Sequence, residues 1–320
     1  MTVECIEVPA DIYHDFLEAH LLLSAVRHLH VLCFGELPPR QLGMLARNDV
    51  LQWACTALRE PWRRELVAYA GELSSTFSVQ MHATLPVPHW QDPGSIGAAE
   101  RLAMHMLEAG SAPIWSAARQ LAILLDHEQP RHSMALRNGE TSSVSFGAYA
   151  KGPFHGLCRK TLTHPNVAMI LNCLIMRVCP RHTWTTLALH FNYGTPPHRD
   201  KQNSHHNLVL ALSLHDDGEL WIETPEGDEA ILFQGMEVWG IRYALQLHAV
   251  RFQAHQLLHY TCAWDTFDRV TLVAYTVQRW ESLGDKVHTQ LSELGFHLPE
   301  RTVRITRDLH LDCLPCVLRD

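Results

Sequence analysis

His198 and Asp200 are spaced so that together they could bind a metal ion. Residues two apart on an extended backbone point the same way, and Pro196 and Pro197 keep the approach extended. An imidazole and a carboxylate can then bind one ion from adjacent positions. Because His-x-Asp occurs by chance in many chains, a solvated surface pair is the alternative, and a third ligand must come from elsewhere.

His259 is the candidate third ligand, and Arg269 follows ten positions later at the head of an apolar run. Two histidines and one carboxylate occupy one face of an octahedral iron and leave room for a bidentate 2-oxo acid and dioxygen. His248 and His255 compete with His259 for this position. The spacing to Arg269 favours His259, because ten residues allow a strand end, a short turn and entry into the neighbouring strand.

Arg269 offers a planar guanidinium that suits the far carboxylate of such an acid. The alternative is an arginine at a strand start that pairs with Asp265 or Asp268. If Arg269 does not bind the far carboxylate, Lys201 and Arg251 are the next candidates.

The segments around these residues predict a helical part followed by a jelly roll or barrel. Apolar residues at spacings of three and four predict helices over residues 11–34, 41–58, 61–73, 96–107 and 113–125. Beyond residue 129, short apolar runs between turn residues predict strands over residues 141–149, 183–193, 208–214, 219–223, 230–239, 245–252 and 270–277. Two more helices are predicted over residues 166–178 and 280–294.

Several short motifs carry a family resemblance. The chain contains Asn-Tyr-x-x-x-Pro-His-x-Asp-Lys-x-Asn from Asn192, Gly-Glu-Leu-Trp from Gly218, His-x-Thr-x-x-Trp from His259, and Asp-Arg-Val-x-Leu-Val-Ala-Tyr-Thr from Asp268. With these motifs, residues 142–279 resemble the 2-oxoglutarate/iron(II)-dependent dioxygenase superfamily, and in particular dioxygenase-like domains of dinoflagellate open reading frames. One departure is Asp217 before Gly218, where such domains often have two glycines.

The resemblance implies a double-stranded β-helix, which is a jelly roll, and two cofactors, Fe(II) and 2-oxoglutarate. It implies the metal ligands His198, Asp200 and His259. For 2-oxoglutarate it implies Arg269 with Thr271 beside it and, by looser likeness to AlkB-type enzymes, Asn192 or Tyr193. We therefore predict an α+β protein with a helical N-terminal region (1–130), a double-stranded β-helix oxygenase domain (131–295) and a C-terminal tail (296–320).

The expected activity is hydroxylation or oxidative demethylation of a substrate, with 2-oxoglutarate and dioxygen as co-substrates and release of succinate and carbon dioxide. The primary substrate stays open among nucleobases, protein side chains and small metabolites. A catalytically silent β-helix binding module derived from a mobile element is one alternative, and a cupin-type metal enzyme without 2-oxoglutarate is another. The complete ligand set and Arg269 argue against both.

The composition limits the class of protein. With a net charge of -8, the chain lacks the positive electrostatic field that sequence-independent nucleic-acid binding needs. Its nine cysteines lie largely within apolar stretches, which is typical of reduced thiols. Acidic residues near the start and a charged break in the apolar run over 21–34 argue against a signal peptide or membrane span. We expect a soluble intracellular protein. His310, Cys313 and Cys316 offer only three ligands, which does not favour a zinc site.

Overall fold

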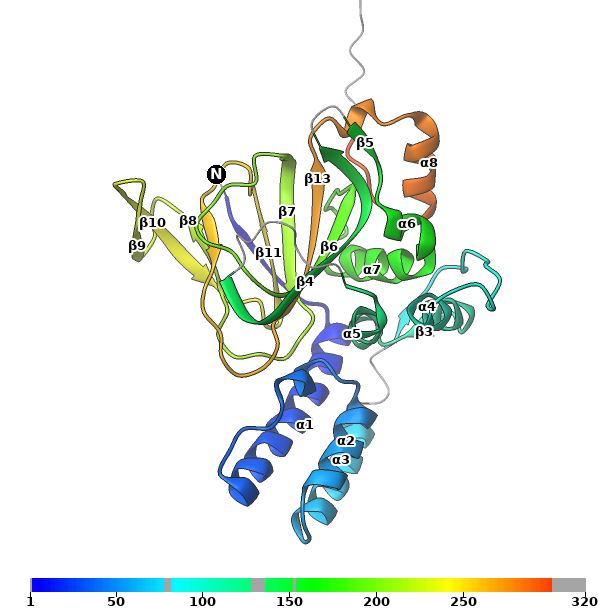
Figure 1. Ribbon diagram of the computed structural model, residues 1–320, viewed down its shortest axis with the longest axis vertical. Helices are drawn as coiled ribbons and strands as arrows, with labels where there is room; N and C mark the ends of the chain where they lie inside the picture. Colours follow the sequence, from blue (N-terminus) through cyan, green and yellow to red (C-terminus); the bar gives the residue numbers. More distant parts are fainter. Residues whose placement is uncertain (1, 78–81, 128–135, 152–153, 301–320) are drawn as a thin grey trace, which may run out of the picture.

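Two antiparallel sheets face each other in the computed structural model, which describes residues 2–77, 82–127, 136–151 and 154–300 (Figure 1). The larger sheet has the strand order β1 (Glu4–Glu7), β11 (His248–Phe252), β7 (Asn203–Ala211), β13 (Val270–Val277), β6 (Thr186–Gly194), β4 (Leu136–Lys151) and β5 (Phe154–Leu157). The smaller sheet has the order β12 (His259–Thr261), β8 (Leu220–Glu223), β10 (Met236–Tyr243) and β9 (Glu229–Phe233). The predicted jelly roll is confirmed.

Helices lie beside the sheets, and several of them extend away from the sheets at the bottom of Figure 1. They are α1 (Ala10–Phe34), the 3-10 turn η1 (Arg40–Gly43), α2 (Arg47–Ala57), α3 (Trp62–Phe77), α4 (Ala98–Glu108), α5 (Ile114–Leu124), α6 (Arg159–Thr163) and α7 (Pro165–Val178). The short strands β2 (Ala83–Thr84) and β3 (Ser111–Ala112) pair with each other, and η2 (Trp280–Ser282) and α8 (Asp285–Glu293) follow β13. The α+β class with a helical N-terminal region is therefore confirmed.

The helical region and the sheets share one hydrophobic core. Helix α7 is the most apolar helix of this core and is buried along most of its length, which a run of aliphatic residues on all sides of a helix predicts. From α5, the indole of Trp115 donates a hydrogen bond of 3.1 Å to the backbone oxygen of Ala211 on β7. Strand β1 extends the larger sheet, with Ile6 opposite Ala249. The division at residues 130 and 295 stays a prediction.

Some observed elements differ from the predicted ones. The strand predicted over residues 230–239 is a hairpin of β9 and β10, turned at Gln234 (φ 52°) and Gly235 (φ 81°). Two left-handed residues form the tight turn whose twist matches a β-hairpin. The helix predicted from residue 41 starts with η1 and continues only from Arg47. Strand β1 was missed, because four residues give too short a pattern.

Helix α1 is the one described helix that is long and apolar enough to cross a membrane by length and composition. This is weak evidence, because the core helix of a soluble protein passes the same test. Ile12, Leu22 and Val26 of α1 are buried in the core, and Arg27 pairs with Asp216 at 2.6 Å. These contacts fit a core helix, and the localisation stays a prediction.

Candidate metal centre

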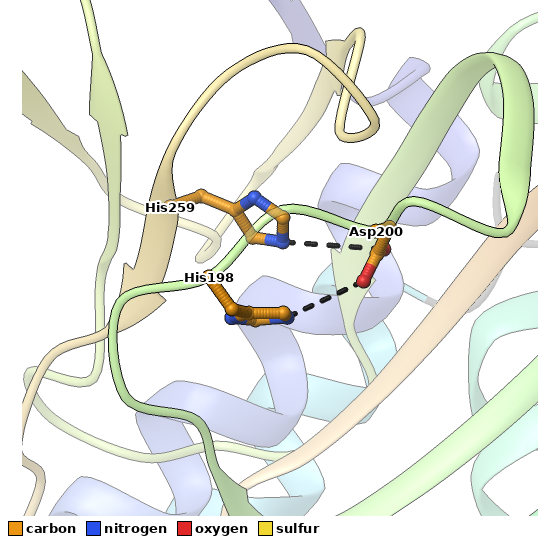
Figure 2. Close-up of side chains that lie close together, drawn as sticks. All are labelled: His198, Asp200 and His259. Carbon is orange, nitrogen blue, oxygen red and sulfur yellow. Dashed lines mark ion pairs between the residues drawn. The ribbon is translucent and has the colours of Figure 1, made fainter.

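His198 and His259 lie directly opposite each other in an isolated antiparallel bridge between the β6–β7 loop and the start of β12. The backbone N–H of each donates to the carbonyl of the other at 3.0 Å, and their ring centroids are 4.3 Å apart. Asp200 completes the group, with Oδ1 3.3 Å from Nε2 of His198 and Oδ2 4.0 Å from Nε2 of His259. The three side chains converge on one point, as Figure 2 shows, and one ligand atom from each lies within 4.8 Å of the others.

Backbone carbonyls orient both imidazoles. Nδ1 of His198 lies 2.8 Å from the oxygen of Pro196, and Nδ1 of His259 lies 3.0 Å from the oxygen of Leu257. A carbonyl can only accept, so each Nδ1 carries a proton, and each Nε2, which faces Asp200, is the nitrogen left to bind a metal ion. This is the tautomer that a metal-binding histidine needs.

Two asparagines hold the carboxylate of Asp200. Nδ2 of Asn203 and Nδ2 of Asn207 donate to Oδ2 at 3.1 Å and 3.0 Å. Both come from β7, and Asn207 is buried. Asn203 belongs to the family motif without an assigned role, and Asn207 lies beyond that motif, so neither was predicted as a site residue.

Glu223 at the end of β8 links the two segments that carry the histidines. Its Oε2 accepts from Nη2 of Arg199 at 2.7 Å and from the backbone N–H of Leu258 at 2.8 Å. Arg199 also donates from Nε to the oxygen of Gln256 at 2.7 Å. The side chain between His198 and Asp200 therefore fixes the approach to His259, which no local sequence pattern indicates.

The three residues open into a cavity of about 350 Å³ between the two sheets. Its polar wall includes Thr195, Thr261 and Thr271, and its apolar wall comes from both sheets. The lining residues are His190, Tyr193, Thr195, His198, Asp200, Asn207, Val209, Leu220, Phe252, His259, Thr261, Arg269, Thr271 and Val273. A small organic acid fits a cavity of this size and character.

Arg269 places a buried cation in the same cavity. Its side chain is 3% exposed, and no carboxylate of the described residues lies within ion-pair distance of the guanidinium. Asp268 instead pairs with Arg40 at 3.7 Å, which disfavours the ion-paired alternative for Arg269. Burial lowers the pKa of Arg269 to about 10, so the guanidinium stays charged at neutral pH. A buried charge without a partner is costly, and an acid in the cavity would compensate it.

The turn before β8 is shaped around Arg269. The carbonyl of Gly218 accepts a hydrogen bond from Nε of Arg269 at 2.9 Å, and a Cβ on Gly218 would lie 2.9 Å from Cδ of that side chain. Gly218 has φ 71° and Asp217 has φ 59°. Aspartate tolerates the left-handed region, so the departure from two glycines preserves the turn.

Asn192 and Tyr193 are placed differently from one another. Tyr193 lines the cavity, whereas Asn192 is not among the lining residues, and the cofactor contact expected of one of them stays a prediction. Oδ1 of Asn192 accepts from the backbone N–H of Arg269 at 2.9 Å and its Nδ2 donates to Asp268 at 2.9 Å. The left-handed Asn192 (φ 46°) breaks the strand alternation, which lets His190 and Tyr193, three residues apart, face the same cavity.

Burial and mutual charge set the protonation of the site. Burial lowers the pKa of His259 to about 4 and that of His190 to about 4, so both rings are neutral at pH 7. Burial also acts to lower the pKa of His198, but the hydrogen bond and charge of Asp200 outweigh it and raise that pKa. Burial acts to raise the pKa of Asp200, and the two imidazoles reverse this and lower it. A metal ion would compete with the proton on Nε2 of His198.

The competing candidates lie outside this cluster. His248 and His255 are not among the described residues that converge on Asp200, and neither they nor Lys201 and Arg251 line the cavity. Arg251 pairs with Glu4 on β1 at 2.9 Å. The expected passage from His259 into a neighbouring strand is wrong, because β12 and β13 belong to different sheets, so His259 and Arg269 face the cavity from opposite walls.

No protein-family model matches the chain, and no curated protein matches it. Solved structures give distant likenesses. An oxidoreductase of the 2OG-Fe(II) oxygenase family from Burkholderia pseudomallei is 13% identical over 62% of this chain and 100% of its own, with a TM-score of 0.35. A Pseudomonas putida prolyl-4-hydroxylase is 10% identical over 65% and 98%, with a TM-score of 0.29.

A prolyl hydroxylase from Trichoplax adhaerens, solved with a peptide fragment of the hypoxia inducible factor oxygen degradation domain, is 10% identical over 71% of this chain and 98% of its own. Its TM-score is 0.29. Because all these identities and TM-scores are low, the case for the chemistry of the site rests on its own residues.

Proposed function

We propose that this chain is an iron(II)- and 2-oxoglutarate-dependent oxygenase. The observation that carries the proposal is the pairing of two features in one cavity. His198, Asp200 and His259 present three ligand atoms at one point, and Arg269 presents to the same space a buried cation that has no ion-paired carboxylate among the described residues.

The donor set fits the expected ion. Two imidazoles and one carboxylate on one face suit Fe(II) and would leave positions open for a chelating acid and for dioxygen. Iron in such a site would supply the oxidation of a substrate C–H bond, coupled to conversion of 2-oxoglutarate into succinate and carbon dioxide. The finer likeness to dioxygenase-like domains of dinoflagellates rests on the sequence motifs.

The remaining residues bind, orient and exclude water. Arg269 would hold the far carboxylate of 2-oxoglutarate, with the hydroxyl groups of Thr271 and Tyr193 available in the same cavity. Asn203 and Asn207 keep the Asp200 carboxylate in place, and Val209, Leu220 and Phe252 give the cavity an apolar wall. A water-poor site strengthens each polar contact and protects the reaction from side products.

The test is an anaerobic titration of the purified protein with Fe(II) and then 2-oxoglutarate. A visible charge-transfer band on addition of the acid supports direct chelation, and its absence favours a metal centre that does not use 2-oxoglutarate. Exposure to air should then give succinate. A band without succinate would favour the silent binding module.

A further inference from the structure

A short segment of the helical N-terminal region packs against the loops next to Arg269. After α1 the chain runs back toward the sheets and forms η1 (Arg40–Gly43) before α2 begins (Figure 1). The backbone N–H of Asp268 donates to the carbonyl of Arg40 at 3.2 Å, and that of Leu214 donates to the carbonyl of Gly43 at 3.1 Å. Segment η1 therefore joins the two loops on either side of it.

These two loops are the ones that hold Arg269. Asp268 immediately precedes Arg269, and its Oδ1 lies 3.7 Å from Nε of Arg40 and 2.9 Å from Nδ2 of Asn192. The other loop, which begins at Leu214, reaches Gly218, whose carbonyl accepts from Nε of Arg269. The backbone and the side chain of Arg269 are thus held by two loops that meet on η1.

A second arginine of the helical region holds the Gly218 loop. Nη1 of Arg27 on α1 lies 2.6 Å from Oδ2 of Asp216, which also accepts from Oγ1 of Thr266 at 3.0 Å. Each loop beside Arg269 therefore carries one aspartate that pairs with one arginine of the helical region. Such exposed pairs contribute little to global stability, so their more specific effect is orientation.

The contact at Gly43 leaves no room for adjustment. A Cβ on Gly43 would lie 2.6 Å from the carbonyl oxygen of Leu214 and 2.8 Å from Cβ of Phe267. The buried Arg119 donates from Nη2 to the carbonyl of Gly43 at 2.8 Å and fixes it from the other side. A methyl group at this position must push apart the loops that position Arg269.

We infer that η1 is a positioning element of the 2-oxoglutarate pocket. Through η1, the helical region holds the loops that place Arg269 in the co-substrate site. This inference rests on the proposed function. It predicts that a change in η1, outside the cavity, weakens binding of the dicarboxylate without disturbing the three metal ligands. Asn192 transmits the effect, because its side chain contacts both Asp268 and the backbone of Arg269.

The test compares Gly43→Ala with the matched control Gly71→Ala. Gly71 lies in α3, and a Cβ added there meets nothing within 4 Å. We expect Gly43→Ala to raise the dissociation constant of 2-oxoglutarate for the Fe(II)-loaded protein by about tenfold, which corresponds to about 1.4 kcal/mol. The affinity for Co(II), measured by chelator competition, should stay within about twofold of wild type, since no metal ligand contacts η1. Gly71→Ala should change neither.

Amide hydrogen exchange on the metal-free protein gives a readout that does not depend on the proposed activity. Gly43→Ala should accelerate exchange at Asp268 and Arg269 relative to wild type and to Gly71→Ala. If Gly43→Ala does not fold, Arg40→Gln replaces it. We then expect a smaller loss of 2-oxoglutarate affinity and a smaller acceleration of amide exchange at Asp268 and Arg269.

Unchanged 2-oxoglutarate affinity in a folded Gly43→Ala protein, or equal losses of cobalt and 2-oxoglutarate affinity, would overturn the inference. If the wild type itself shows no band with 2-oxoglutarate, the proposed function fails. The amide exchange rates at Asp268 and Arg269 then still decide whether η1 holds the Asp268–Arg269 segment in place.

Discussion

Replacing Arg269 with alanine should separate co-substrate binding from metal binding. The guanidinium is 3% exposed, faces the cavity and has no carboxylate partner among the described residues, so its contact with a bound dicarboxylate forms away from water. A charge-assisted bidentate contact in such a place contributes about 2 to 5 kcal/mol. The dissociation constant of 2-oxoglutarate should therefore rise by roughly 30-fold to several thousandfold.

The metal should be affected little, because Arg269 is held by groups outside the ligand set. Its backbone N–H donates to Asn192 and its Nε donates to Gly218, and neither contact involves a histidine or Asp200. Arg269→Lys is the graded control. It keeps a positive charge but loses the planar fork and the contact to Gly218, so its 2-oxoglutarate affinity should fall between those of wild type and Arg269→Ala.

The assay is an anaerobic titration of each Fe(II)-loaded protein with 2-oxoglutarate, followed by the visible band, with metal affinity measured by chelator competition. If Arg269→Ala binds 2-oxoglutarate as tightly as wild type, the anchor is another residue. Parallel losses of metal and 2-oxoglutarate affinity would mean that Arg269 supports the whole site, and the reasoning from its separate contacts would be refuted.

Three further outcomes are expected. His259→Ala should abolish metal-dependent succinate formation while His255→Ala keeps it, and activity in a metal-loaded His259→Ala protein would show that the third ligand is another residue. Gly218→Ala should weaken 2-oxoglutarate binding more than cobalt binding, because a Cβ would lie 2.9 Å from Cδ of Arg269, and equal affinities to wild type in titrations of both ligands would contradict this. Burial lowers the pKa of His182 to about 4, below its unfolded value of about 6.5, so the unfolded chain takes up a proton that the folded chain does not. The free energy of unfolding should therefore fall by about 2 kcal/mol from this residue between pH 6.5 and pH 5, and His182→Gln should lack that loss in urea titrations at both pH values; an identical pH dependence in wild type and variant would rule the mechanism out.

The sequence predicts the part of the site that lies within short segments. His198 and Asp200 are two residues apart on an extended stretch, so their common direction follows from local geometry. The alternation of β13 likewise places Arg269 and Thr271 in the same cavity. The jelly roll follows from the same short, regularly spaced strands.

Other features depend on contacts that no local pattern contains. Asn192 has a left-handed backbone, so the side chains after it point to the opposite face of the sheet from the one that strand alternation predicts. An Asn-Tyr pair in a strand gives no sign of this. Glu223 ties Arg199 to Leu258 across segments that are far apart in the sequence. The contact of η1 with Asp268 joins segments that are far apart in the sequence. Hydrophobic periodicity could therefore predict the helices but not their contact with the loops next to Arg269.

The backbone bridge between His198 and His259 should keep the candidate metal site in shape when no ion is bound. Two main-chain hydrogen bonds already hold these residues together, and backbone carbonyls already aim their rings. Metal uptake then requires no ordering of the chain, unlike in small zinc domains whose ligands meet only when the metal folds them. Treatment with a chelator should leave the jelly roll intact and ready to reload. The fraction of protein with iron in this site would thus depend on the available iron, and the metal-free protein would stay folded and able to bind it.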